Sequence, residues 1–264
     1  MSEKIEHASE NAITQSNIAR VIPSKELDTL SCFKWISLAI NDFINAKMIS
    51  LAYGLIFTLL PLSIYFLVKS TAWYLVIFPA MVCFMLIGPY LAAGLYDVSW
   101  QFEKGKKPSF RHSLKAMSRN AVNEWGFGLI LMILMIFWLR VASIIHALYP
   151  SYLDPNLANL WPFLIVGTLV GIAFTTVVFF ISAFTQPILL ERKVDIATAI
   201  LTSMNAVWQN KLPMFVWALV ISFSVLLGFV TYFVAFLVIM PIIGYASWHG
   251  YIDTIETKRE RKFE

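Results

Sequence analysis

The sequence predicts an all-helical membrane protein with six transmembrane helices, arranged as three hairpins that are each preceded by a cytoplasmic amphipathic helix. Three observations predict this fold class. First, 59% of the 264 residues are hydrophobic and only 14% are charged, whereas a soluble domain carries about 25% charged residues. Second, uncharged apolar runs long enough for the roughly 20 residues that a spanning helix needs occupy 48–68, 70–96, 155–190 and 212–252. Third, all but two of the 20 lysines and arginines fall on one side of the membrane if the chain crosses it six times.

This composition excludes several classes of protein. A water-soluble enzyme, a secreted disulfide scaffold and a disordered chain are ruled out, and Cys32 and Cys83 are expected to be free thiols because two cysteines are too few for a disulfide framework. The net charge of +4 indicates a basic cytoplasmic rim rather than nucleic-acid binding. Residues 1–26 lack the apolar segment of a signal peptide. We therefore expect a disordered cytoplasmic tail over 1–26, a membrane domain over 27–256 and a charged cytoplasmic tail over 257–264.

The individual spans follow from the apolar runs in chain order. The first four are expected at 48–68, 73–96, 125–145 and 163–190. The last run, 212–252, is too long for one helix. It accommodates two helices of about 19 residues, with a tight turn near Gly228 or Thr231.

The basic residues decide whether that last run forms one span or two. If it forms two, every one of the 20 lysines and arginines except Lys69 and Arg140 lies on the same side of the membrane. A five-span chain would instead export the basic C-terminal cluster. Because basic segments stay in the cytoplasm, the charge distribution predicts six spans with the N- and C-termini both cytoplasmic.

Each odd-numbered span is preceded by a stretch with helical periodicity, at 33–43, 110–121 and 196–207. In each stretch, apolar residues recur every three or four positions, opposite a polar or basic face. Helices of this kind lie in the membrane interface, and Asp195 stands at the N-cap position of the third. The sequence therefore predicts three cytoplasmic interfacial helices.

The even-numbered spans share a proline in their inner halves, namely Pro89, Pro187 and Pro241. A proline ring removes one backbone hydrogen bond and kinks the helix. The recurrence of amphipathic stretch and proline favours an internal repeat of one unit used three times, although any six-span chain also contains three hairpins. In a true repeat, the kinked helices meet around a common axis and their freed carbonyls face an inner-side vestibule. Gln186 and His249 would form its floor, where we expect a ligand.

Arg140 is the only charged residue well inside a span, which makes it a functional candidate. Near the outer interface its long side chain can snorkel to water, so two interpretations stand: a snorkelling arginine, or one that faces inward toward a substrate or partner. Trp248 stands near a span end, as interfacial anchors do. The candidate ligand or partner contacts are Arg140, Gln186, Trp248 and His249.

The fourth span carries further small and polar residues. Gly167 and Gly171 form a pair that lets helices pack closely. Further polar residues follow along the same helix and could line a polar path, although hydroxyls in spans also bond their own backbone: Thr175, Thr176, Ser182, Thr185 and Gln186.

No motif for catalysis, metal binding or cofactor binding emerges. His146 and His249 fall at opposite ends of the bilayer, roughly 30 Å apart, so they cannot share a metal. The sequence contains no Cys-x-x-Cys, Gly-x-Ser-x-Gly or P-loop motif. Asp97, Glu103 and Asp253 are expected as ordinary charges of the inner rim. We therefore expect no catalytic residue, no metal and no cofactor.

The closing segment Pro-Ile-Ile-Gly-Tyr-Ala-Ser-Trp-His-Gly-Tyr, at 241–251, resembles the terminal signature of a bacterial family of integral membrane proteins called domain of unknown function 2189. Gly-Leu-Tyr at 94–96, followed by Phe-Glu-Lys-Gly at 102–105, resembles its middle signature, and 195–199 is also similar. The chain departs from the pattern at Tyr245, where many members carry a histidine. The resemblance implies a location in the bacterial inner (cytoplasmic) membrane, without an established activity.

The favoured function is non-enzymatic. We expect a small transporter, or a lipid- or partner-binding membrane protein whose basic inner face meets anionic headgroups. One alternative is an accessory or assembly subunit of a respiratory complex, and another is a membrane enzyme acting on lipids. The expected partners are membrane lipids with anionic headgroups at the cytoplasmic face or a second membrane protein, without nucleic acid.

Overall fold

The computed structural model describes residues 21–71, 77–118, 121–148 and 157–256. This part of the chain is helical apart from its connections and one isolated antiparallel bridge between Ser24 and Ile255. The predicted all-helical fold class is therefore confirmed. The expected tail over 1–26 lies mostly outside the described residues, and the tail over 257–264 lies wholly outside them.

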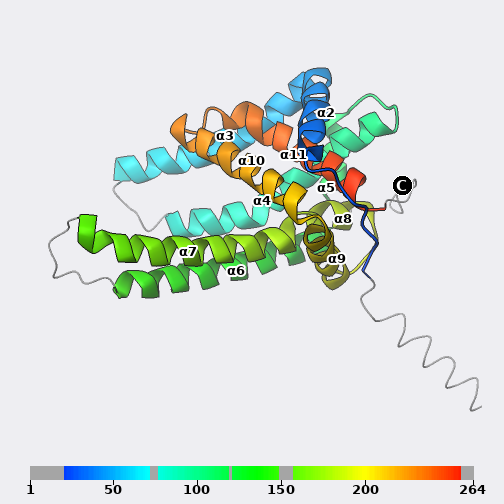
Figure 1. Cartoon of the computed structure of the whole chain (residues 1–264). Helices are drawn as coiled ribbons and strands as arrows, with labels where there is room; N and C mark the ends of the chain where they lie inside the picture. Colours follow the sequence, from blue (N-terminus) through cyan, green and yellow to red (C-terminus); the bar gives the residue numbers. More distant parts are fainter. Residues whose placement is uncertain (1–20, 72–76, 119–120, 149–156, 257–264) are drawn as a thin grey trace, which may run out of the picture.

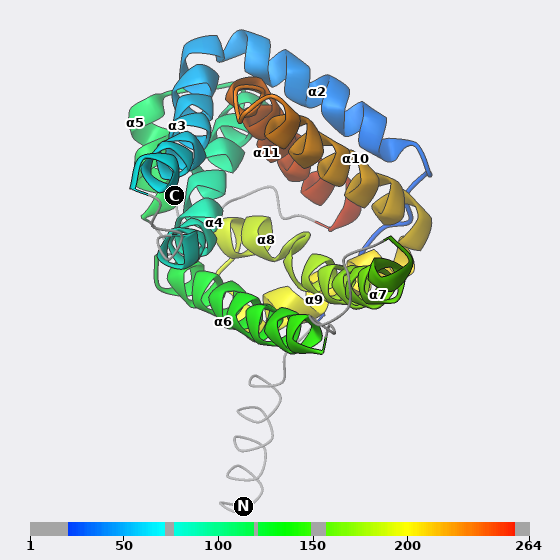
Figure 2. The same cartoon turned by 90° about the vertical axis from the view of Figure 1, so that its left-hand side faces the viewer.

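Six long helices lie side by side in a bundle (Figure 1), and seen end on they form a ring (Figure 2). They are α3 (Lys47–Thr71), α4 (Ile77–Glu103), α6 (Ala121–Ala147), α7 (Leu157–Ser182), α10 (Lys211–Val230) and α11 (Phe236–Thr254). Within the described residues, four stretches are long and apolar enough to cross a membrane: Lys47–Ser70, Ala121–Ala147, Leu160–Glu191 and Lys211–Val230.

Two of the long helices, α4 and α11, are not among these four stretches. For α4, the side chains of residues 77–85 lie outside the described part. α11 begins with apolar residues, but its second half contains Trp248, Tyr251 and Thr254, which are fully buried against other helices. That half therefore packs against protein rather than facing lipid.

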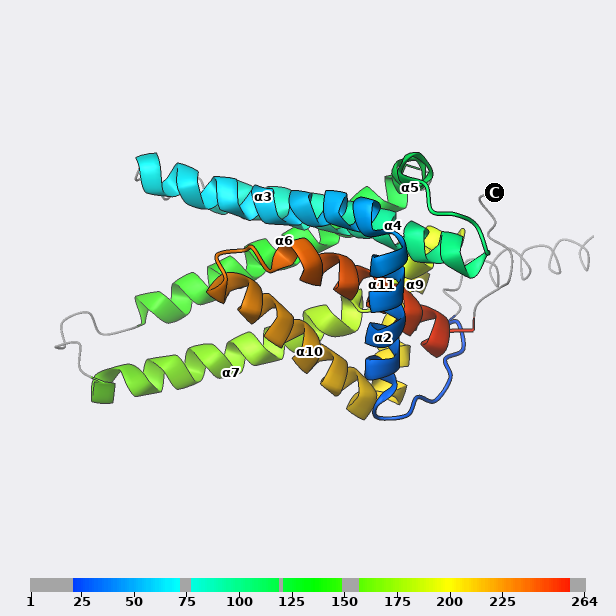
Figure 3. The same ribbon diagram turned by 90° about the horizontal axis from the view of Figure 1, so that it is seen from above.

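All three predicted amphipathic stretches contain a helix: α2 (Ser31–Asn45), α5 (Phe110–Met117) and α9 (Ile196–Gln209). They gather at one end of the bundle, with the short helix α8 (Thr185–Glu191) beside them (Figures 1 and 3). We call this end the amphipathic end. Figure 3 shows α2 crossing the direction of the long helices, as a helix in the membrane interface would.

The predicted N-cap of α9 is confirmed. The Asp195 carboxylate accepts hydrogen bonds from the Thr198 hydroxyl at 2.6 Å and from the Thr198 N–H at 3.0 Å. Because both bonds stabilise the ionised form, they lower the pKa of Asp195 below its ordinary value.

Each amphipathic helix packs against the end of a long helix. α5 packs on α4, α9 packs on α7 and α8, and α2 packs on α11. The last contact is close, because a Cβ atom at Gly250 would lie 3.0 Å from the Trp35 ring. The last long helix is thus joined to the first amphipathic helix, and this contact closes the ring seen in Figure 2.

The expected fourth span, 163–190, is interrupted between α7 and α8. Pro187 has no N–H and cannot bond the carbonyl four residues earlier. Ser203 of α9 replaces part of the broken ladder, because its hydroxyl donates to the Phe180 carbonyl at 2.9 Å and accepts from the Phe184 N–H at 3.1 Å. Ser203 thus separates the Phe180 carbonyl from the Phe184 N–H at the end of α7, and Pro187 leaves the next carbonyls without a full set of helical donors.

The last apolar run divides into α10 and α11, as predicted. They are joined by a turn over 231–235, in which Tyr232 and Phe233 have φ angles of 51° and 67°. The turn begins at Thr231, so the predicted position is confirmed.

The packed core lies at the amphipathic end. Its largest fully buried side chains include Trp35, Tyr53, Trp248 and Tyr251. By contrast, none of the residues in the most apolar 18-residue segment of Leu160–Glu191 is buried inside the protein. A surface of this kind is stable when lipid covers it, so the polar packing and the membrane-facing surface are separated along the bundle axis.

Residues 21–30 run across the amphipathic end as an extended strap. The N–H groups of Ile22 and Leu27 donate to Thr202 Oγ1 at 3.1 Å and to Asn210 Oδ1 at 2.8 Å. The strap therefore ties the start of the described chain to α9.

Candidate functional site

Four carboxylates from four different helices are buried at the amphipathic end. Asp42 of α2, Asp97 of α4, Glu124 of α6 and Glu191 of α8 are each at most 6% exposed. Such a group needs hydrogen-bond or charge partners, because removing a carboxylate from water is costly. Asp97 is fully buried, so its expected place as a charge of the inner rim is wrong.

Two of these carboxylates pair with histidines. Asp42 Oδ2 accepts hydrogen bonds from Ser99 Oγ at 2.6 Å and lies 2.8 Å from His249 Nε2. Asp97 Oδ2 lies 2.7 Å from His112 Nδ1. The first pair joins α2, α4 and α11, and the second joins α4 and α5. Both pairs therefore fasten an amphipathic helix to a long one.

Glu191 also has a basic neighbour. Its carboxylate accepts a hydrogen bond from the Tyr251 hydroxyl and lies 3.7 Å from the Arg192 Nε atom. The hydrogen bond with Tyr251 joins α8 to α11.

Glu124 is partnered differently. Its Oε2 atom accepts a hydrogen bond from the Gln186 amide, which also donates to the Pro89 carbonyl at 2.9 Å. The second carboxylate oxygen, Glu124 Oε1, and the amide oxygen, Gln186 Oε1, are both buried without a hydrogen-bond partner in the described structure. Two orphaned acceptors thus belong to two side chains that already contact each other.

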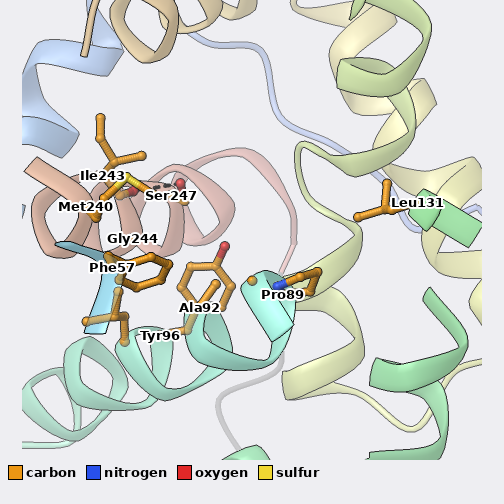
Figure 4. Close-up of a pocket in the computed structure, with 11 residues that line it drawn as sticks. Phe57, Pro89, Ala92, Tyr96, Leu131, Met240, Ile243, Gly244 and Ser247 are labelled. Atoms are coloured by element: carbon orange, nitrogen blue, oxygen red, sulfur yellow. Dashed lines mark hydrogen bonds between the residues drawn. The ribbon is translucent and has the colours of Figure 1, made fainter. Parts of the chain in front are cut away.

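A small cavity of about 240 Å³ lies beside this pair, between α3, α4, α6 and α11. Pro89 and Tyr96 line it from α4, and Met240 and Ser247 line it from α11. Figure 4 shows the Tyr96 hydroxyl pointing from α4 into the space between Pro89 and Ser247. The cavity lies where two of the three proline-bearing segments approach each other, since Met240 precedes Pro241 in α11.

A larger groove of about 770 Å³ lies between α7 and α10. Its walls are two stripes of residues three or four positions apart. The α7 stripe runs from Thr168 to Phe180 and the α10 stripe from Lys211 to Ser222. The lining is mostly apolar, and Lys211 is its one charged residue. The Lys211 end of the groove lies at the amphipathic end, next to α9.

The structure places the four sequence-predicted contact residues in different surroundings. Gln186 is buried beside Pro89, as the vestibule hypothesis expects, but neither Gln186 nor His249 lines the cavity. Trp248 is fully buried and stacks on Tyr96 at 6.3 Å between ring centroids, so its expected place as an interfacial anchor is wrong. Arg140 is exposed on α6, away from the amphipathic end.

Two of the hydroxyls predicted in the fourth span bond the backbone of their own helix. Thr176 Oγ1 donates to the Ile172 carbonyl and Ser182 Oγ to the Val178 carbonyl, each at 2.8 Å. These two hydroxyls are thereby satisfied without a ligand. Besides Thr176, the α7 wall of the groove carries the hydroxyl side chains of Thr168 and Thr175.

No group of three or more His, Cys, Asp and Glu side chains in the described residues could hold a metal ion. Cys32 is a free thiol, as expected, and burial raises its pKa. The side chain of Cys83 lies outside the described part.

Sequence reasoning did not single out Asp42, Glu124, Glu191 or Lys211. Each stands at the edge of an apolar run or in an amphipathic stretch, where a charged residue ordinarily faces water. One feature of the sequence could have drawn attention to Glu124: it directly precedes Trp125, where the apolar segment of the third expected span begins.

Residues 77–191 match the model of a family described as Predicted integral membrane protein (DUF2189), which confirms the resemblance found in the sequence. No curated protein and no solved structure matches the chain. The matched segment contains Pro89, Glu124 and Gln186, whereas the α10 wall of the groove lies outside it.

Proposed function

We propose that this integral membrane protein crosses the bacterial inner membrane six times and binds an anionic phospholipid of the inner leaflet. In this proposal, an acyl chain occupies the groove between α7 and α10, and the headgroup phosphate lies at Lys211. The observation that carries the proposal is an apolar groove between two spanning helices with a single lysine at one end.

The arrangement of the bundle supports six spans. α4 packs on α6 and α11 packs on α3, and both of these partners are long and apolar enough to cross a membrane. The lysines of α2, α5 and α9–α10, namely Lys34, Lys115 and Lys211, gather at the amphipathic end, whereas Lys69 lies at the far end of α3. By the positive-inside rule, the amphipathic end faces the cytoplasm. The described chain begins near Ser24 and ends near Ile255, which are bridged at this end, and this supports cytoplasmic termini.

The threefold repeat is supported by the contacts of the amphipathic helices. Each of them packs on the helix that carries one of the three prolines, in cyclic order around the ring. Pro187 departs from the pattern, because it lies in the separate helix α8 rather than within one continuous span. The kinks at the three prolines remain a prediction.

The length of the groove fits one leaflet. The α7 stripe from Thr168 to Phe180 is about 18 Å long at 1.5 Å per residue. The hydrocarbon core of a bilayer is about 30 Å thick. The groove therefore reaches from the cytoplasmic interface past the midplane, the depth that an acyl chain of the inner leaflet occupies.

The charge at the end of the groove fits a phosphate. Lys211 is exposed, and its Nζ atom lies 3.9 Å from the centroid of the Trp208 ring. A tryptophan beside a lysine at a membrane interface is typical of headgroup contacts. A polar transport substrate fits less well, because the Thr176 and Ser222 hydroxyls in the groove donate to their own helices.

The proposal is tested by native mass spectrometry of the delipidated protein with added phosphatidylglycerol or phosphatidylcholine. A lysine near an anionic surface contributes about 1 kcal/mol, so Lys211→Ala should weaken phosphatidylglycerol binding roughly fivefold. Phosphatidylcholine, whose phosphate is balanced by the choline cation, should lose less. Lys115→Ala is the matched control, because Lys115 is exposed on α5 at the same end but does not line the groove.

A second variant tests the groove itself. Ala218→Trp places a large ring between the two stripes and should reduce binding of both lipids. The lipid-groove proposal is wrong if Ala218→Trp binds both lipids as the unmodified protein does, or if Lys115→Ala and Lys211→Ala weaken binding equally.

A further inference from the structure

We propose that Glu124 and Gln186 form a proton-binding site inside the helix ring, in which Glu124 is held as a neutral carboxylic acid paired with the Gln186 amide. This site is independent of the lipid groove. Its ligand is a proton, bound at Glu124 Oε1 and shared with Gln186 Oε1.

Glu124 differs from the other three buried carboxylates in the kind of side chain that it contacts. Asp42, Asp97 and Glu191 each lie within 4 Å of a basic side chain, namely His249, His112 and Arg192. Among the described residues, Glu124 contacts no basic group, and its partner is a neutral amide. A carboxylate that is 2% exposed and lacks a counter-charge is neutralised by binding a proton.

A proton on Glu124 would also supply the hydrogen bond that the pair lacks. A carboxylic acid and a primary amide can form two parallel hydrogen bonds: the amide N–H donates to the acid carbonyl, and the acid O–H donates to the amide oxygen. The first of these bonds is present between Gln186 and Glu124. The two atoms of the second bond are the two orphaned oxygens, so one proton would satisfy both.

The surroundings keep the site neutral. Among the described residues, Tyr96 of α4 lies close enough to interact electrostatically with Glu124. From α8 the site receives Gln186, and no charged side chain of α7 or α9 contacts Glu124 in the described structure. The Pro89 carbonyl, which accepts from the same amide at 2.9 Å, fixes the orientation of Gln186 and leaves its oxygen for the acid.

The site is also linked to the small cavity through Pro89 and Tyr96. Pro89, whose carbonyl holds Gln186, lines the 240 Å³ cavity, and the Tyr96 and Ser247 side chains line the same cavity. Tyr96 therefore borders the cavity and also lies close enough to Glu124 to interact with it electrostatically. An ionisable residue placed in this way inside a membrane protein is typical of proton-binding sites.

Infrared spectroscopy of the full-length protein in phospholipid vesicles tests the proposal. At neutral pH we expect a carbonyl-stretch band of a protonated carboxylic acid, which is lost in Glu124→Gln and retained in the matched control Glu191→Gln. Gln186→Leu should keep the band but shift it to higher frequency, because the acid loses its hydrogen-bonded amide.

Three results would overturn the proposal. One is a band that survives in Glu124→Gln, and another is its absence from the unmodified protein. The third is a band present in choline chloride but lost in sodium chloride of equal ionic strength, which would assign the site to a sodium ion. Glu124→Gln keeps a side chain of nearly the same shape, and a circular dichroism spectrum identical to that of the unmodified protein shows that it folds.

Discussion

Asp42 offers a direct test of how the amphipathic end is held together. It is 5% exposed, and its Oδ2 atom contacts both Ser99 and His249. Asp42→Ala leaves both partners without their acceptor. A buried polar group without a partner costs about 1–3 kcal/mol, so the two groups predict a loss of about 3 kcal/mol in the free energy of unfolding. Asp42→Asn, which keeps one acceptor oxygen, should lose less than Asp42→Ala.

Denaturant titration in detergent micelles, followed by tryptophan fluorescence, measures this loss. Asn41→Ala is the matched control, because Asn41 is the exposed neighbour of Asp42 on α2. A double-mutant cycle with His249→Ala should give a coupling energy of about 0.5–3 kcal/mol, as residues in one network do. The reasoning is refuted if Asp42→Ala costs no more than Asn41→Ala, or if the cycle shows no coupling.

Two further predictions concern α9 and the contact between α3 and α11. Asp195→Ala removes the N-cap of α9 and should cost about 1 kcal/mol in the same titration. The lowered pKa of Asp195 means that its charge contributes fully above the unfolded pKa of about 3.9. That contribution is lost as the pH falls through the folded pKa, so the stability gap to Asp195→Asn should close in acid and persist at neutral pH. Gly54→Ala should cost about 1–3 kcal/mol, because its Cβ would lie 1.9 Å from the Leu237 carbonyl oxygen. Gly167→Ala, with open space at its Cβ, should be neutral in thermal unfolding, and equal effects of the two substitutions would contradict the packing of α3 on α11.

Local features of the fold were predictable from the sequence. The amphipathic helices, the turn that starts at Thr231 and the cap at Asp195 each depend on residues a few positions apart. The interruption before α8 was not predictable, because the apolar pattern continues through it and Ser203 of another helix helps to form it. Side-chain periodicity carries no information about such a contact.

The candidate site was predictable only in part, for a related reason. Gln186 and Pro89 were both assigned to the inner vestibule, and the structure joins them by a hydrogen bond of 2.9 Å. Glu124 was missed because a glutamate at the start of a span ordinarily faces water. Its burial depends on α4 and α8, which come from distant parts of the sequence. Likewise, the pairing of His249 with Asp42 spans almost the whole chain.

The most direct test of the six-span account is to determine on which side of the membrane each end of α11 lies. In a chain whose native cysteines are replaced, a cysteine at Tyr232, in the exposed turn before α11, should react with an impermeant maleimide from outside the cell. A cysteine at Glu256, exposed after α11, should react only once the inner membrane is permeabilised, as a cysteine at Lys104 should. Labelling of Glu256→Cys from outside intact cells, or protection of Tyr232→Cys, would contradict the six-span topology.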